Sequence, residues 1–138
     1  SIDQSLTVQS TMLCSSANNK VTCYGDLEVQ GVLSETSGAS LKRDVQDMTD
    51  ALRTAMKLKP RKFIKTVPIA GHEVPEFGLV AQEVEEIPEL AFTTRVTEEG
   101  LKALHYRSLE TLTLAAPQDL ARLVKRVAER VDALSERV

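Results

Sequence analysis

A serine and a lysine lie five positions apart in the stretch Thr36-Ser37-Gly38-Ala39-Ser40-Leu41-Lys42. A serine hydroxyl is a weak nucleophile unless a neighbouring base takes its proton. A lysine can be that base when removal from water disfavours its charged ammonium form. The Ser37 hydroxyl would then attack the carbonyl carbon of Thr36. The product is an ester formed by an N→O acyl shift, and its hydrolysis would cut the chain between Thr36 and Ser37.

Spacing alone leaves the choice of hydroxyl open, because Ser40 is equally available to Lys42. Gly38 would permit the unusual backbone angles that attack on the preceding carbonyl demands. The candidate catalytic residues are Ser37 and Lys42, the cleavage site is the bond between Thr36 and Ser37, and we expect neither a metal nor another cofactor.

Composition limits the classes of partner. The 138 residues carry a net charge of -3, with basic and acidic side chains interleaved. Nucleic acid as a main partner is not expected, because phosphate binding needs a concentrated basic face. We also expect no membrane-spanning segment and no signal peptide. Aromatic residues make up only 4% of the chain, so the core must use aliphatic side chains or surface buried between subunits.

Residues 1–36 favour short strands. Leu6–Val8 and Val21–Tyr24 are β-prone runs, and Asp26–Gln30 alternates between apolar and polar residues. So short a segment cannot close its own core, and it is expected to pair with copies of itself or with chain that precedes it. The alternative is a tail without fixed structure. Cys14 and Cys23 fit no zinc-binding pattern and are expected to be reduced, with a disulfide as the alternative.

The middle of the chain predicts a mixture of helices and strands. A helix is expected over Asp44–Lys59, with Asp44 as its N-cap and Pro60 as its end. The further expected elements, in chain order, are a strand over Arg61–Val67, a loop carrying His72, a buried strand over Phe77–Ala81, a short helix over Gln82–Ile87, and a hairpin made of Leu90–Val96 and Leu101–His105. Glutamates of the short helix could bind a metal, but a solvated acidic face is the preferred interpretation.

From Arg107 onwards the pattern is helical, with Leu109, Leu112 and Ala116 on one face. Pro117 is expected either to kink this helix or to begin a new one. After it, apolar residues follow a heptad, with valine at the a positions 124, 131 and 138 and Leu, Val and Leu at the d positions 120, 127 and 134. The spacing favours an intersubunit coiled coil, and β-branched residues at both positions lean towards a trimer. Packing on the chain's own subunit is the alternative.

Several blocks after Ser37 occur in a recognisable order. The most specific is Gly78–Val84, which reads Gly-Leu-Val-Ala-Gln-Glu-Val and is followed by Pro88–Leu90. The others are Leu41-Lys42, Val45, Ala51-Leu52, Leu58-Lys59-Pro60, Phe63 and Tyr106-x-x-Leu109. From Ser37 to about Leu120 the sequence resembles the C-terminal intramolecular chaperone family of phage tailspikes and tail fibres, of which endosialidase tailspikes carry the type example.

The resemblance implies that Ser37 and Lys42 stand at the family's serine–lysine dyad, with the same spacing. Such domains trimerise, template the folding of an upstream β-structured fibre, and cut themselves off at the serine. Each copy would be a single-turnover serine autoprotease that acts in cis. Release would free residues 37–138 and leave a kinetically trapped fibre that ends at Thr36.

The sequence departs from the family pattern at three positions. Gly38 stands where the family usually has Asp or Asn, Ser40 stands where it usually has a basic residue, and Pro117 breaks what is commonly an unbroken helix. An acidic or amide side chain at position 38 could orient the dyad, so Gly38 bears on the rate of cleavage. Folding and trimerisation should survive these departures.

We therefore predict an α+β homotrimer with three parts: an intertwined β stalk (1–36), a small mixed α/β segment (37–106) and a long coiled-coil helix (107–138). The expected partners are the chain itself and the upstream fibre chain in cis. The expected location is the host cytoplasm during assembly, with the fibre part in the virion tail. The alternative function is a permanent trimerisation tip that stays on the fibre and does no chemistry.

Overall fold

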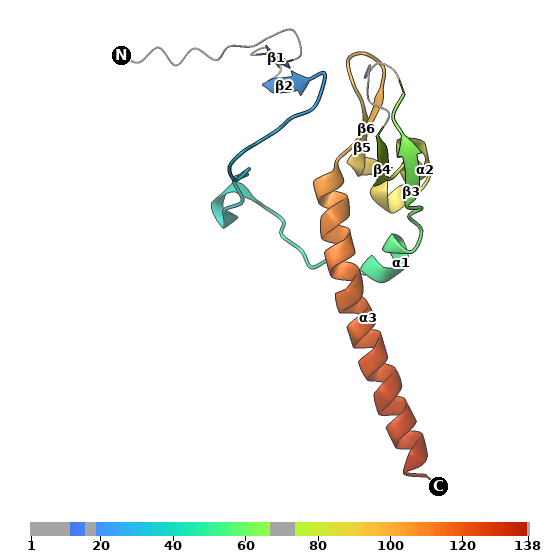
Figure 1. The fold of residues 1–138 in the computed structure, drawn as a ribbon. Helices are drawn as coiled ribbons and strands as arrows, with labels where there is room; N and C mark the ends of the chain where they lie inside the picture. Colours follow the sequence, from blue (N-terminus) through green and yellow to red (C-terminus); the bar gives the residue numbers. More distant parts are fainter. Residues whose placement is uncertain (1–11, 16–18, 67–73, 138) are drawn as a thin grey trace. The chain divides into compact units, whose positions relative to one another are not determined.

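The computed structural model describes residues 12–15, 19–66 and 74–137. The chain divides into two compact units, one made of residues 1–44 and 64–74 and the other of residues 45–63 and 75–138. Short strands and helices precede one long C-terminal helix, so the predicted α+β class with a long C-terminal helix is confirmed (Figure 1).

The first unit contains one hairpin. Strands β1 (Met12–Ser15) and β2 (Lys20–Cys23) are antiparallel, with Met12 opposite Cys23 and Ser15 opposite Lys20. The turn places Asn19 at a φ of 52°, a left-handed conformation that asparagine tolerates. The strand expected at Val21–Tyr24 is therefore present with its bounds shifted by one residue, whereas β1 was not predicted. The run Leu6–Val8 lies outside the described residues.

Residues 24–38 follow the hairpin without regular secondary structure. The alternating run Asp26–Gln30, which was expected to form a strand, has no regular secondary structure. Its apolar side chains and those that follow it are exposed to solvent; they are Leu27, Val29, Val32 and Leu33. The segment therefore has the alternating sequence of a strand but not the structure of one in the described part of the chain.

Helix α3 (Tyr106–Ser135) dominates the second unit (Figure 1). At a rise of 1.5 Å per residue, its 30 residues span about 45 Å. Pro117 lies inside this helix, so neither a new helix at Pro117 nor a break there occurs. The proline removes one hydrogen bond, the one to the carbonyl of Thr113, and both residues are exposed, so water can hydrate that carbonyl.

Helix α1 (Ala51–Ala55) packs against α3 but is much shorter than the predicted helix over Asp44–Lys59. Residues 45–50 have no regular secondary structure. Asp44 has a φ of 54° and Asp50 a φ of 55°, so the expected N-cap at Asp44 is wrong. The amphipathic pattern is present in the sequence, but the chain enters the helix only at Ala51.

The remaining elements of the second unit are short. Strands β3 (Arg61–Ile64) and β4 (Pro75–Gly78) pair with each other, and helix α2 (Ala81–Glu85) follows them. The 3-10 helix η2 (Pro88–Thr93) then leads into the antiparallel hairpin of β5 (Thr94–Val96) and β6 (Lys102–Leu104).

Two expectations in this region need correction. The strand predicted from Leu90 begins only at Thr94, because Pro88 opens a 3-10 helix whose first turn includes Leu90. The strand at Phe77 is not buried, since 87% of the Phe77 side-chain surface is exposed. The end of the strand predicted over Arg61–Val67 and the loop residue His72 lie outside the described residues.

The core of the second unit lies between α3 and the elements that precede it. The predicted inner face of α3 is confirmed, because Leu109, Leu112 and Ala116 are all buried. The side chains clustered with Leu109 and Leu112 come from α1, α2 and η2; they are Ala51, Val84, Ile87 and Leu90. Full burial of each large aliphatic side chain contributes about 1.5–3 kcal/mol.

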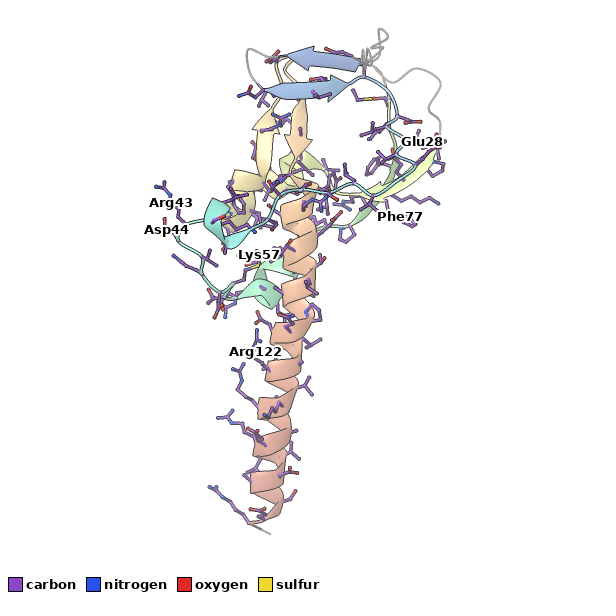
Figure 2. The ribbon with its side chains drawn as sticks, turned by 90° about the vertical axis from the view of Figure 1, so that its left-hand side faces the viewer. Glu28, Arg43, Asp44, Lys57, Phe77 and Arg122 are labelled. Carbon is purple, nitrogen blue, oxygen red and sulfur yellow. The ribbon has the colours of Figure 1, made fainter. Side chains whose placement is uncertain are left out.

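Ion pairs join α2 and η2 to their neighbours. Arg61 donates two hydrogen bonds to Glu83, at 3.0 and 2.6 Å, and this guanidinium lowers the pKa of the carboxyl group. Lys57, just after α1 (Figure 2), bonds Glu89 at 2.9 Å and lowers its pKa. Lys102 pairs with Glu85. The acidic face expected over Gln82–Ile87 is thus partly neutralised by cations, and no metal-binding cluster of three acidic, His or Cys residues occurs in the described ranges.

The hydroxyl of Tyr106, the first residue of α3, contacts the backbone of Leu79. It accepts a hydrogen bond from the Leu79 amide at 3.1 Å and lies 3.3 Å from the Leu79 carbonyl oxygen. A Cβ added at Gly78 would lie 2.9 Å from this hydroxyl and 3.0 Å from the ring of Phe63. The glycine that opens the block Gly78–Val84 is therefore required by packing, because any side chain there displaces the tyrosine or the phenylalanine.

We predict that Gly78→Ala lowers the free energy of unfolding by about 1–3 kcal/mol, the usual cost of overpacking. Gly31→Ala is the matched control, because no atom lies within 4 Å of an added Cβ there. Urea denaturation of both variants tests the prediction. Equal stability of Gly78→Ala and the parent chain would show that the contact with Tyr106 is not required.

Candidate active site

The candidate residues lie around a single short turn. The 3-10 helix η1 (Ala39–Leu41) is closed by hydrogen bonds from the Leu41 amide to the Gly38 carbonyl at 3.0 Å and from the Lys42 amide to the Ala39 carbonyl at 3.2 Å. This turn folds the chain back, so that side chains five residues apart in sequence come within reach of each other.

The turn brings Ser37 and Lys42 together. Lys42 Nζ lies 2.5 Å from Ser37 Oγ and 3.1 Å from the carbonyl oxygen of Ser37. Thr36, whose carbonyl carbon is the expected point of attack, directly precedes Ser37 in the chain. In the described structure Lys42 hydrogen bonds to the Ser37 hydroxyl and not to that of Ser40. This contact favours Ser37 over Ser40 as the partner of Lys42, a choice that spacing alone leaves open.

In this contact the lysine is a donor, and a lysine that is to accept the serine proton must first be neutral. Burial favours the neutral amine, because it removes the water that stabilises the ammonium ion. Both Ser37 and Lys42 are exposed in the single chain, as are all residues from 24 to 50. In the described part of one chain, Ser37 and Lys42 are therefore close together, as the reaction needs, but Lys42 is not shielded from water.

Gly38 does not use the conformational freedom of glycine in this state. Its φ of -66° and ψ of 148° are extended angles that any residue adopts. An added Cβ would meet only the Ser40 hydroxyl, at an ordinary distance of 3.9 Å. The unusual backbone angles that attack on the Thr36 carbonyl would demand are not adopted in this state, so the role expected for Gly38 during the attack stays a prediction.

Comparison with known protein families identifies the segment that contains this turn. Residues 37–97 match a peptidase family whose model is described as chaperone of endosialidase. The matched segment makes up less than half of the 138 residues. The match supports a chaperone role and a peptidase-type fold, and it confirms the resemblance inferred from the sequence blocks. It begins at Ser37 and ends just after β5. The sequence has no significant match among curated proteins.

Two residues outside the matched segment support its elements. Tyr106 fixes the backbone at Leu79, and Asp119 accepts a hydrogen bond from the Leu52 amide at 3.1 Å. Sequence analysis missed the role of Asp119, because 67 positions separate it from its partner and no local pattern links them. The motif Tyr106-x-x-Leu109 combines one residue that hydrogen bonds to the backbone just after β4 with another that enters the core.

No helix in the described ranges combines the length and the apolar character that crossing a bilayer requires.

We predict that Gly38→Asp folds as well as the parent chain, because the backbone angles at position 38 suit any residue and an added Cβ has room. The free energy of unfolding should change by less than about 0.5 kcal/mol, as is usual for exposed positions. Thermal denaturation measures this. A large loss of stability would mean that position 38 adopts glycine-only angles in the assembled protein.

Proposed function

We propose that this chain joins the end of a phage tail fibre or tailspike, residues 1–36, to an intramolecular chaperone, residues 37–138. The chaperone trimerises, templates the folding of the upstream β-structured fibre, and releases itself by cutting the bond between Thr36 and Ser37. Synthesis and release take place in the host cytoplasm, and the fibre part remains in the virion tail. The partners are two further copies of the chain and the upstream fibre in cis.

One observation carries the proposal. Lys42 Nζ lies 2.5 Å from Ser37 Oγ, and Ser37 is the first residue of the segment that matches the chaperone family. A self-cleaving chaperone requires its nucleophile at the boundary between the part that is released and the part that is retained. The reactive pair and the family boundary coincide at the same residue, which supports cleavage there.

The proposed reaction has two steps. Neutral Lys42 takes the Ser37 hydroxyl proton while Oγ attacks the Thr36 carbonyl carbon, and the lysine then returns a proton to the Ser37 nitrogen as the C–N bond breaks. The result is an ester between Thr36 and Ser37 Oγ. Water then attacks the ester carbonyl, which releases a carboxylate on Thr36 and restores the serine hydroxyl. Packing between three copies would exclude water from Lys42 and favour the neutral amine.

The apolar stripe of α3 supports association. The heptad residues after Pro117 remain between 46% and 61% exposed in the single chain; they are Leu120, Val124, Val127, Val131 and Leu134. Val138, the last a position, lies outside the described residues. A stripe at 3.5-residue spacing on an otherwise charged helix is what a coiled coil buries. We infer that three α3 helices pack along this stripe.

The exposed segment at residues 24–38 supports the β stalk. Its alternating apolar side chains are exposed in the described chain, and three copies would bury them in a common core. Cutting after Thr36 then leaves these residues on the fibre. With the trimerising template gone, refolding is slow, and the fibre is stable for kinetic reasons.

The second candidate is a permanent trimerisation tip that does no chemistry. The exposure of Ser37 and Lys42 in the single chain favours it, because a lysine can act as a base only where burial disfavours its ammonium form. The two candidates share the trimer and differ only in whether the bond after Thr36 is cut.

We predict that the purified full-length chain converts to two fragments, residues 1–36 and 37–138, on denaturing electrophoresis. Ser37→Ala and Lys42→Ala should each restore a single full-length band, because each removes one member of the dyad. Ser40→Ala is the matched control and should still be cut. Mass spectrometry of the fragments locates the bond. An uncut parent chain favours the permanent tip, and cleavage of Ser37→Ala at the same bond would sink the dyad assignment.

A second prediction tests association. Val131→Glu places a charge at an a position and should convert a trimer into monomers, whereas Ala133→Glu places the same charge on the outward c position and should leave the trimer intact. Sedimentation velocity of both variants, made in the uncleavable Ser37→Ala background, gives the oligomeric state. Equal sedimentation of the two variants would contradict a coiled coil along this stripe.

A further inference from the structure

The C-terminal half of α3 lies outside the core of the second unit. The buried residues of α3 all precede Pro117, and every described residue from 121 to 137 is exposed. In Figure 1 this part of the helix extends beyond α1. Its charged side chains are therefore placed to meet another copy of the chain rather than the chain's own core.

The charges on this part of α3 differ between the two sides of the apolar stripe. In a heptad, positions g and c flank one side of the stripe, and positions e and b flank the other. Arg130 and Arg137 occupy g positions and Arg126 occupies a c position, so the first side is basic. On the second side, Asp132 occupies a b position beside e residues that are all small. These e residues are Ala121, Ala128 and Ser135.

The opposite charges of Arg130 and Asp132 have no partner on their own helix. Side chains pair along a helix at spacings of three and four residues. At these spacings the only charged neighbour of Arg130 is Arg126, and the only charged neighbours of Asp132 are Glu129 and Glu136. Neither Arg130 nor Asp132 forms an ion pair within the described part of the chain. Like charges at such spacings destabilise a lone helix, so both residues gain from an opposite charge on another chain.

Parallel packing of α3 brings these two residues together. In a parallel coiled coil, the g side of each helix faces the e side of the next. The long side chain of Arg130 would cross the small residues Ala128 and Ser135 of the neighbouring helix and reach Asp132, which lies between them in sequence. Antiparallel helices would instead place g against g, so that arginines face one another at a cost in free energy.

The preceding heptad makes the same arrangement selective for register. Lys125 occupies the b position there, but the g residue on the facing side is Leu123, which can cover the apolar stem of the lysine. A shift of one helix by seven residues would place Arg130 against Lys125 of its neighbour. Only helices that are in register pair the arginine with an acidic residue.

We propose that Arg130 of each copy forms an ion pair with Asp132 of the next copy, and that these pairs hold three α3 helices parallel and in register. The inference rests on the trimer of the proposed function. Each helix presents its basic side to one neighbour and its small, acidic side to the other. Because these two sides differ, the contact is heterologous and closes into a ring instead of a two-fold pair. Parallel helices also place the three clusters around Leu109 at the same end of the bundle.

Charge reversal in the full-length, uncleavable Ser37→Ala chain tests the pair. Arg130→Asp and Asp132→Arg should each raise the dissociation constant of the trimer on the order of 10-fold or more, because each places like charges opposite one another at all three contacts. The double variant should return close to the parent value, since the exchanged charges attract again. Sedimentation equilibrium measures the three constants.

The sign of the effect distinguishes contact between copies from an effect within one helix. Within a helix, each single variant replaces a like-charge neighbour by an opposite one, which stabilises the helix and would tighten the trimer. Glu136→Arg is the matched control, because it makes the same charge change as Asp132→Arg at an outward f position. It should alter the dissociation constant by less than about 2-fold. Single variants that bind as tightly as the parent, or more tightly, would overturn the proposal.

A cross-link tests the orientation. Leu134 occupies a d position near the C-terminal end, so its three copies lie side by side in parallel helices. In antiparallel helices that bury the same stripe, about ten residues or ~15 Å separate them along the axis, which no disulfide spans. Leu134→Cys, in a Ser37→Ala chain whose Cys14 and Cys23 are replaced by serine, should form inter-chain disulfides on non-reducing electrophoresis. A trimer of this variant that does not cross-link would rule out parallel helices.

The outcomes separate this inference from the function on which it rests. A parent chain that stays monomeric overturns the trimer and the ion pair together. A trimeric parent whose association ignores charge reversal at Arg130 and Asp132 overturns the ion pair alone. Cleavage after Thr36 is blocked in every variant, so the result does not depend on whether the chain cuts itself.

Discussion

Apolar surface that one chain cannot bury is the constraint on which the rest of the structure depends. Within the described residues, the buried apolar side chains gather in one small cluster around Leu109 and Leu112, whereas the stripe of α3 and the segment 24–38 expose theirs. Burial of apolar surface is the main favourable term in folding, so a chain that exposes this much gains most from association. The second unit holds its helices and strands around α3 without help, and the remaining apolar side chains are available for other copies.

The same constraint connects assembly to chemistry. Ser37 and Lys42 are already in contact in a single chain, so proximity is a local property of the turn Ala39–Leu41. Desolvation of the lysine is not local, because no described residue covers it. If the chain cuts itself as proposed, a dyad that is preformed by the local turn and activated by packing between copies would cut only after the copies have assembled. Such an order would protect an unassembled chain from losing its template before the fibre has folded.

Local patterns predicted those parts of the fold that local interactions determine. The inner face of α3, helix α2 and the β5–β6 hairpin follow from periodicity and turn residues. The beginning of α1 could not be predicted, because its cap comes from Asp119 on a distant helix. Pro117 was expected to interrupt α3, yet an exposed proline costs one hydrogen bond to a carbonyl that water can reach. Phe77 was expected inside because strands are often buried, but a two-stranded sheet has too few neighbours to cover both of its faces.

The position of the nucleophile has a physical rationale if the chain cuts itself. A trimerising template stabilises the fibre only while it is attached. Attachment also provides a route for unfolding, in which the template unfolds first and the fibre follows. Cutting at the first residue of the template removes that path without removing any residue of the stalk. The lysine must then lie after the serine, on the released side, because a base on the stalk would leave part of the catalytic apparatus in the mature fibre. The order Thr36, Ser37, Lys42 satisfies this requirement. The 3-10 helix η1 is a short and tight turn, and it brings the lysine side chain back to Ser37, next to the bond that would be cut.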